Sequence, residues 1–203
     1  MQRMSTLLTL LLTLVLVSTS LLAADTLPKP GKFDEEEILT GERLGKKYTT
    51  IVAKDYSIKD VEIANIDDEE IKLLKDGEKD IVKALTESTV KHLKKQNIFK
   101  RVEANGPAKA NAVILKGKIT KFNGGVGAAK WFLGFAAPKS TKTNITIEAE
   151  LVDATTGTVL AKIKDVRSGG EGNTLGSKNM VRAFIVQAQD EGEELAEFIK
   201  EIY

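Results

Sequence analysis

The amino-acid sequence predicts an α+β fold: a single, mostly antiparallel sheet of about five strands with two main amphipathic helices on one face. Three observations lead to this prediction. Two long segments carry apolar residues at the spacing of a helix, and several shorter segments alternate apolar and polar residues with the period of a strand. The order of these segments, β-α-β-β-β-β-α, places one helix in a crossover connection and the other at the end of the chain.

The first 24 residues have the pattern of a secretory signal peptide. Arg3 precedes an apolar run over residues 7–17, and small residues suited to cleavage follow, ending at Ala23 and Ala24. An uncleaved membrane anchor is the alternative, because residues 5–24 are mostly apolar over a length close to that of a spanning helix. In either case we predict that the protein is exported.

The remainder of the chain is predicted to form a tether and one domain. Residues 25–47 are polar, contain two prolines and include an acidic run, which is typical of a flexible arm. Residues 48–203 contain all of the periodic segments and are long enough to bury a core of their own.

The domain is predicted to start with a strand and a helix. Residues 48–58 are rich in β-branched and aromatic residues, which favours a strand. An apolar stripe at helical spacing follows, and Gly77 is expected to divide it into a short helix and a longer one over residues 78–96. Asn97 suits the left-handed position just after a helix.

Four more strands and a final helix complete the predicted fold. The strands are expected at residues 98–104, 111–122, 143–153 and 158–166. The last two flank the turn 154–157 and form the clearest hairpin. The final helix has one continuous apolar face, and its small Ala188 and Gly192 are expected to pack closely on the sheet.

Charged side chains are predicted to pair across the solvent-exposed face of the sheet. Lysines lie on one face of the strand 111–122, and glutamates lie on one face of the strand 143–153. If these strands are neighbours, the two sets meet as opposite charges. The residues concerned are Lys116, Lys118, Lys121, Glu148 and Glu150.

The composition argues against several classes of function. The chain has no cysteine, hence no disulfide, thiol nucleophile or lipid-modified cysteine, and its single histidine, His92, excludes a histidine-rich metal site. Its 30 basic and 29 acidic residues are interspersed and create no broad field for nucleic acid. The glycine-rich loop over residues 168–178 departs from the phosphate-binding and dinucleotide-binding patterns. We therefore predict no catalytic residue, metal ligand, cofactor, bound nucleotide or nucleic-acid partner.

One apolar segment, GGVGAAKWFLGFAAPKS over residues 124–140, is the best candidate for a contact surface. It contains the only tryptophan and fits neither a clean helix nor a clean strand. Either its apolar side chains cover an open end of the core, or they face a partner or a membrane surface. The candidate contact residues are Lys130, Trp131, Phe132, Leu133 and Phe135.

This segment and its neighbours resemble a bacterial envelope family called domain of unknown function 4410. The resemblance rests on a strand, a glycine-rich segment with a basic residue and an aromatic pair, a Gly-Phe step, and a hairpin with the pattern D-x-x-T-G. Residues 85–103 also fit the family's helix and following strand, so the resemblance spans about residues 48–203. The matching positions are Gly124, Lys130, Trp131, Gly134, Phe135, Asp153, Thr156 and Gly157.

The resemblance implies a small α/β domain that is exported to the bacterial envelope, often as a lipoprotein, and has no known catalytic residues. The order of elements is also similar, at the level of topology alone, to a domain of curli-export and penicillin-binding-protein-activator lipoproteins. This chain departs from the family pattern because it lacks the lipidated cysteine. It also has Ala136 and Pro138 where glycines are usual.

Together these features predict a non-catalytic, unlipidated protein of the bacterial envelope. It would be a periplasmic or outer-membrane-associated binding or assembly module, with one or more envelope proteins as partners. The alternative is a membrane-surface or pore-type protein that inserts residues 124–138, which are too few for a spanning hairpin but sufficient for a shallow insertion with Trp131 at the headgroups. An enzyme is the third alternative, and it would require a polar cleft with a strongly shifted carboxylate.

Overall fold

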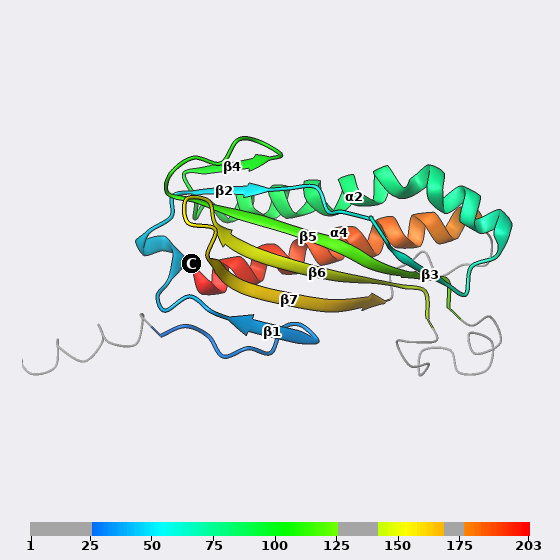
Figure 1. Ribbon diagram of the computed structural model, residues 1–203, viewed down its shortest axis with the longest axis horizontal. Helices are drawn as coiled ribbons and strands as arrows, with labels where there is room; N and C mark the ends of the chain where they lie inside the picture. Colours follow the sequence, from blue (N-terminus) through cyan, green and yellow to red (C-terminus); the bar gives the residue numbers. More distant parts are fainter. Residues whose placement is uncertain (1–25, 126–141, 169–176) are drawn as a thin grey trace, which may run out of the picture.

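The computed structural model describes residues 26–125, 142–168 and 177–203, and within these ranges it shows one sheet with two long helices on one face (Figure 1). The predicted signal peptide, residues 1–24, lies outside the described residues. The helices are α2 (Asp68–Gln96) and α4 (Ser177–Ile202), and a short 3-10 helix, η1, spans Leu44–Lys46. The two-helix α+β architecture predicted from the sequence is therefore confirmed.

The sheet has seven strands in the spatial order β1-β7-β6-β5-β2-β4, and β3 extends it by pairing with β5. Strands β1, β7, β6 and β5 pair antiparallel with one another in that order, whereas β2 pairs in parallel with β4 and β5, and β3 pairs in parallel with β5. The strands are β1 (Glu35–Ile38), β2 (Thr50–Ala53), β3 (Glu62–Ala64), β4 (Arg101–Ala104), β5 (Ala112–Asn123), β6 (Asn144–Asp153) and β7 (Val159–Ser168).

The prediction of about five mostly antiparallel strands is therefore wrong in two respects, because the sheet is mixed and has seven strands. The parallel half arises from chain connections. Helix α2 is the crossover that returns the chain to β4 beside β2. Strand β4 has only four residues, so the connection over residues 105–111 can run back along it and bring β5 to the other side of β2, again in parallel.

The predicted tether over residues 25–47 is also wrong for much of its length, because the structure includes it in the fold. Strand β1 pairs with the edge of β7. Phe33 is buried edge-on against Phe198, with ring centroids 5.6 Å apart, and Leu44 is fully buried. Pairing at a sheet edge uses backbone groups, so a polar segment with only a few apolar residues can be held there without a visible strand pattern.

The two helices pack closely against each other because each has a glycine at the contact. Helix α2 runs through Gly77 without a break, contrary to the expected division, and a Cβ at Gly77 would lie 2.5 Å from Val181 Cγ1 of α4. Gly192 of α4 lies against the backbone of α2, and not against the sheet as expected. The helix end at Asn97 is as predicted, with a left-handed φ of 53°.

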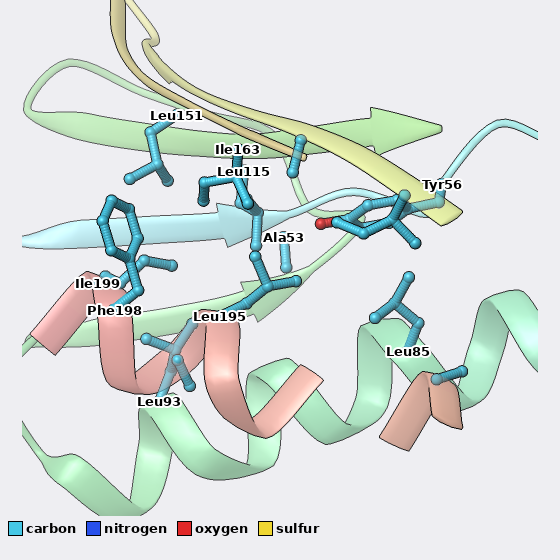
Figure 2. Close-up of a cluster of buried hydrophobic side chains, with 14 of the residues drawn as sticks. Ala53, Tyr56, Leu85, Leu93, Leu115, Leu151, Ile163, Leu195, Phe198 and Ile199 are labelled. Carbon is cyan, nitrogen blue, oxygen red and sulfur yellow. The ribbon is translucent and has the colours of Figure 1, made fainter. Parts of the chain in front are cut away.

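The core lies between this helix pair and the inner face of the sheet (Figure 2). It draws side chains from both layers, and the largest are fully buried. Members from the sheet side are Ala53, Tyr56, Leu115, Leu151 and Ile163, and members from the helices are Leu85, Leu93, Leu195, Phe198 and Ile199.

The outer face of the sheet carries stripes of charge, one sign per strand. Lys116 pairs with Glu150 at 3.5 Å and Lys118 with Glu148 at 2.9 Å, which confirms the predicted pairing of β5 with β6. Lys121 instead pairs with Glu62 of β3. The pattern continues outward through the cross-strand pairs Lys162–Glu37 and Lys164–Glu35, which join β7 to β1. Because a slip of one residue would turn these charges inward, the stripes help to fix the strand register.

Substituting Gly192 by alanine tests the close helix contact. In an open helix, Gly→Ala stabilises by about 0.5–1 kcal/mol. Here the new Cβ would lie 2.7 Å from Leu85 O and 2.8 Å from Thr89 N, both backbone atoms, so the helices would have to separate. We expect Gly192→Ala to lower the free energy of unfolding by about 1–3 kcal/mol, measured by urea denaturation.

The matched control is Gly41→Ala, where no atom lies within 4 Å of the new Cβ. That substitution should change the free energy of unfolding by less than about 0.5 kcal/mol. A stabilised Gly192→Ala protein would show that the helices are not held at this distance.

Candidate functional site

The predicted contact residues Lys130, Trp131, Phe132, Leu133 and Phe135, and the motif glycine Gly134, lie outside the described residues. The structure does describe where this segment leaves the sheet and rejoins it. The chain leaves at Gly124 and Gly125 after β5 and returns at Lys142 and Thr143 before β6. We call these four residues, together with Asn65, Asn123, Asn144 and Gln187, the segment base.

Hydrogen bonds join the two sides of the segment base. Thr143 Oγ1 donates to Gly124 O at 3.0 Å, which ties the outgoing chain to the returning chain. Asn123 Oδ1 accepts from Gly125 N at 3.0 Å and from Asn65 Nδ2 at 2.8 Å. One buried amide oxygen therefore fastens the end of β5 both to its own next turn and to the residue that follows β3.

Helix α4 adds a further connection to the segment base. Gln187, which is buried on α4, donates from Nε2 to Thr143 O at 2.9 Å. On the returning chain, Asn144 Nδ2 donates to Lys142 O at 2.7 Å. Both connections are made by polar side chains in a buried setting, where satisfied hydrogen bonds hold groups in one arrangement.

Gly124, a glycine of the family pattern, has a steric role in this base. A Cβ at this position would collide with Asn65 O and come within 2.9 Å of Ile66 Cγ1. The backbone of β5 can therefore approach the turn after β3 only where there is no side chain. The bond from Gly124 N to Ala64 O, 2.9 Å long, depends on that approach.

The end of β7 lies beside the segment base. Asn123 of β5 is opposite Asn144 of β6, and Asn144 is opposite Ser168, the last residue of β7. Both internal ranges that lie outside the described residues, 126–141 and 169–176, therefore begin at the same end of the sheet.

The hairpin motif lies at the opposite end of β6 and forms a polar anchor. Asp153 is buried, and its Oδ1 accepts from Thr155 N at 2.7 Å and Thr156 N at 3.0 Å. Asp153 therefore holds the backbone of the turn. Gly157 supplies the left-handed φ of 73° that the turn needs, and Thr156 Oγ1 bonds Thr158 Oγ1 at 2.8 Å.

The other oxygen of Asp153 holds the chain that enters β2. Oδ2 accepts from Lys47 Nζ at 2.6 Å and from Tyr48 Oη at 2.8 Å. The hydrogen bond from Lys47, and then that from Tyr48, hold the pKa of Asp153 well below its ordinary value. Sequence reasoning missed both partners, because the pairing spans more than 100 residues and Lys47 was assigned to the tether.

A second group of charged side chains, the Arg167 cluster, was also missed. It comprises Arg167 and Asp165 of β7 with Glu191 and Glu194 of α4. Arg167 Nε bonds Glu191 at 2.9 Å, and its two terminal nitrogens hold Glu194 by both oxygens. Glu191 was detectable in the sequence, because it lies three residues after Ala188 and four before Leu195 on the core-facing stripe of α4.

The strongly shifted carboxyl groups of the described residues contact partners within the chain. The two carboxyl groups with the largest pKa shifts, Asp153 and Glu191, are both buried against protein partners. In the described ranges, no three His, Cys, Asp or Glu side chains are grouped so that they could hold a metal ion. Among the same residues, no helix combines the length and the apolar character that crossing a membrane requires.

Comparisons with known proteins give a family and distant structural likenesses. The family model described as Domain of unknown function (DUF4410) matches residues 51–173, as the resemblance predicted. No curated protein matches the chain. Among solved structures, a PelC dodecamer from Paraburkholderia phytofirmans is 10% identical, with a TM-score of 0.41 over 80% of this chain and 95% of that chain. A Xanthomonas campestris protein described by the family model DUF330 is 11% identical, with a TM-score of 0.41 over 78% of this chain and 87% of that chain.

The Asp153 anchor yields a prediction about pH. A carboxyl group whose pKa is lowered on folding adds stability that is fully present above its unfolded pKa, near 3.8, and is lost as the pH falls through the folded value. In Asp153→Asn, the amide can still accept from the turn but cannot pair with the charge of Lys47. We expect a loss of about 1–3 kcal/mol at pH 7, a modest range because Lys47 is half exposed and screened by solvent.

The measurement is urea denaturation of both proteins across the acid range. The difference between parent and Asp153→Asn should shrink as the pH falls below about 3.8, where the unfolded chain takes up the proton, and should be lost only as the pH falls through the lower pKa of the folded protein. Thr156→Val is the matched control, since it removes an exposed hydroxyl from the same turn and keeps the backbone donor to Asp153. An equal loss at all pH values would contradict the ion-pair explanation.

Proposed function

Because this chain belongs to the family described as a domain of unknown function, DUF4410, we propose that it is a non-catalytic module of the bacterial envelope that binds a partner protein. The binding surface is the apolar segment with Lys130, Trp131, Phe132, Leu133 and Phe135. The protein is exported by its N-terminal signal and works in the periplasm or at the outer membrane. It carries no lipid on cysteine, because the sequence has none.

The observation that carries the proposal is the hydrogen-bonded segment base. Asn123, Thr143 and Gln187 are buried polar side chains that fix the chain on both sides of the segment. Binding residues commonly lie on loops that a rigid scaffold positions, because a fixed base lowers the entropy lost on binding. A segment with four large apolar side chains on such a base suits a contact surface.

The rest of the described surface is mainly polar, and this supports the choice of the apolar segment as the binding surface. Among the described residues, Leu39 is the single large apolar side chain that is well exposed to solvent, at 45%. The outer sheet face carries paired charges. A hollow of about 660 Å³ on that face is lined mainly by these charges, whose partners are already present within the chain.

The alternative is a membrane-surface protein that inserts residues 124–138. The consecutive residues Lys130, Trp131 and Phe132 favour this alternative, since a basic residue beside aromatic rings suits the headgroup region of a bilayer. Such an insertion would be shallow, because the segment is shorter than a spanning helix. Pore formation would require further copies of the chain.

Affinity capture from the native envelope tests the proposal. The full chain and a Trp131→Ser/Phe132→Ser variant are expressed in the parent bacterium, crosslinked in the intact envelope and isolated. We expect the parent to recover a defined partner protein and the variant to lose at least about 90% of it, which corresponds to a loss of about 1.4 kcal/mol or more in binding. The thermal midpoints of the two proteins should agree.

Leu39→Ser is the matched control, because it removes an exposed apolar side chain far in sequence from the segment. It should recover the partner as the parent does. Unchanged recovery by the Trp131→Ser/Phe132→Ser variant would exclude this segment as the binding surface.

Liposome flotation separates the membrane alternative from the proposal. The purified protein is mixed with vesicles of phosphatidylethanolamine and phosphatidylglycerol and centrifuged through a density gradient. Our proposal predicts that the parent stays at the bottom. Flotation of the parent that is abolished by Trp131→Ser would favour the membrane-surface function instead.

A further inference from the structure

The Arg167 cluster brings one guanidinium together with three carboxyl groups between β7 and α4. Arg167 contacts Glu191 at 2.9 Å and Asp165 at 3.1 Å, and it holds both oxygens of Glu194. Glu194 is partly exposed, whereas Asp165 and Glu191 are buried. Within the protein interior, a single positive charge therefore faces two carboxyl groups that water does not reach.

Glu191 is the least satisfied member of this cluster. Its side chain is fully buried, and its Oε1 finds no hydrogen-bond partner among the described residues. Its other oxygen accepts a hydrogen bond from Arg167, and Arg167 also pairs with two competing acids, Asp165 and Glu194. An ionised carboxylate in this position would leave a buried charge incompletely paired, which is costly, whereas the neutral acid would not.

We propose that Glu191 is an internal proton-binding site: it is packed as the neutral carboxylic acid between α4 and β7, and loss of its proton weakens the attachment of α4 to the end of β7. The proton lies where two buried acids compete for one guanidinium. Its partner Arg167 precedes Ser168, the last residue of β7, so the site lies next to the segment base.

The charged and titratable groups around Glu191 come from several elements. Strand β7 supplies Asp165 and Arg167, and α4 itself supplies Asp190 and Glu194. Tyr56, which follows β2, is buried, and its hydroxyl has no partner among the described residues. Asp34, before β1, donates its backbone N–H to Asp165 and accepts from Val166 N. Helix α2 brings His92, which faces Glu193 at 3.8 Å.

The direction of the shift agrees with this geometry. Burial, opposed by the charge of Arg167 and reinforced by that of Asp165, raises the pKa of Glu191 to about 8. The unfolded chain releases this proton near pH 4.5, so between about 4.5 and 8 the folded protein holds one proton more than the unfolded chain. Stability from this group is therefore present at acid pH and declines as the pH rises through that window.

Urea denaturation of the parent and Glu191→Gln across pH 5 to 9 tests the proposal. Glutamine has the shape of the neutral acid and cannot ionise. The ratio of unfolding constants, parent over Glu191→Gln, should rise about tenfold per pH unit up to about pH 8 and then level off. Glu197→Gln, which changes an exposed acid on the same helix that pairs with Lys32, should follow the parent at every pH.

Two further measurements extend the test, and the first needs only the parent, so the proposal stays falsifiable if Glu191→Gln does not fold. The infrared spectrum of the parent should show the carbonyl band of a protonated carboxyl group at pH 6.5, and this band should be gone by pH 10. At pH 9, backbone amides of residues 163–168 and 188–195 should exchange hydrogen faster in the parent than in Glu191→Gln, while at pH 6 the two should agree. A parent without the band, or a ratio of unfolding constants that is flat with pH, would overturn the proposal.

Discussion

The close approach of α2 and α4 over one face of the sheet is the constraint on which the rest of the structure depends. Glycines at Gly77 and Gly192 remove the side chains that would hold the helices apart. With both helices on the same side, no other helix or strand of the described residues covers the outer face of the sheet. This face is therefore exposed to solvent, as one face of an antiparallel sheet can be. Its alternating stripes of lysine and glutamate are the consequence.

The same packing explains why a carboxyl group is found in the interior. Helix α4 lies near enough to the sheet for Arg167 of β7 to reach Glu191 and Glu194 across the interface. An arginine at the end of a core-facing strand needs partners, and α4 supplies them at the spacing of one helical turn. The cluster thus ties the end of β7 to α4 at the point where the apolar core gives way to the segment base.

The sequence predicted best the elements whose patterns are local. The hairpin of β6 and β7, the start of β5 and the left-handed end of α2 at Asn97 are each encoded by a few neighbouring residues. The mixed sheet was missed because parallel pairing of the short strands β2, β3 and β4 depends on connections and leaves no periodic signal. Strand β1 was missed because an edge strand can be polar on both sides. The Arg167 cluster and the Lys47–Asp153 pair unite residues far apart in the chain, so spacing could not reveal them.

Two buried carboxyl groups at opposite ends of the fold respond to pH in opposite ways, because hydrogen-bond donors outweigh burial at one and burial outweighs its shared positive partner at the other. Asp153 has Lys47 to itself and two backbone donors, so its charged form is favoured. Glu191 is fully buried, which favours its neutral form, and it shares its one positive partner, Arg167, with Asp165 and Glu194. The first group loses its stabilising charge in strong acid, and the second loses its proton as the pH rises toward 8. For these two groups together, stability is therefore greatest in mild acid, between the two transitions.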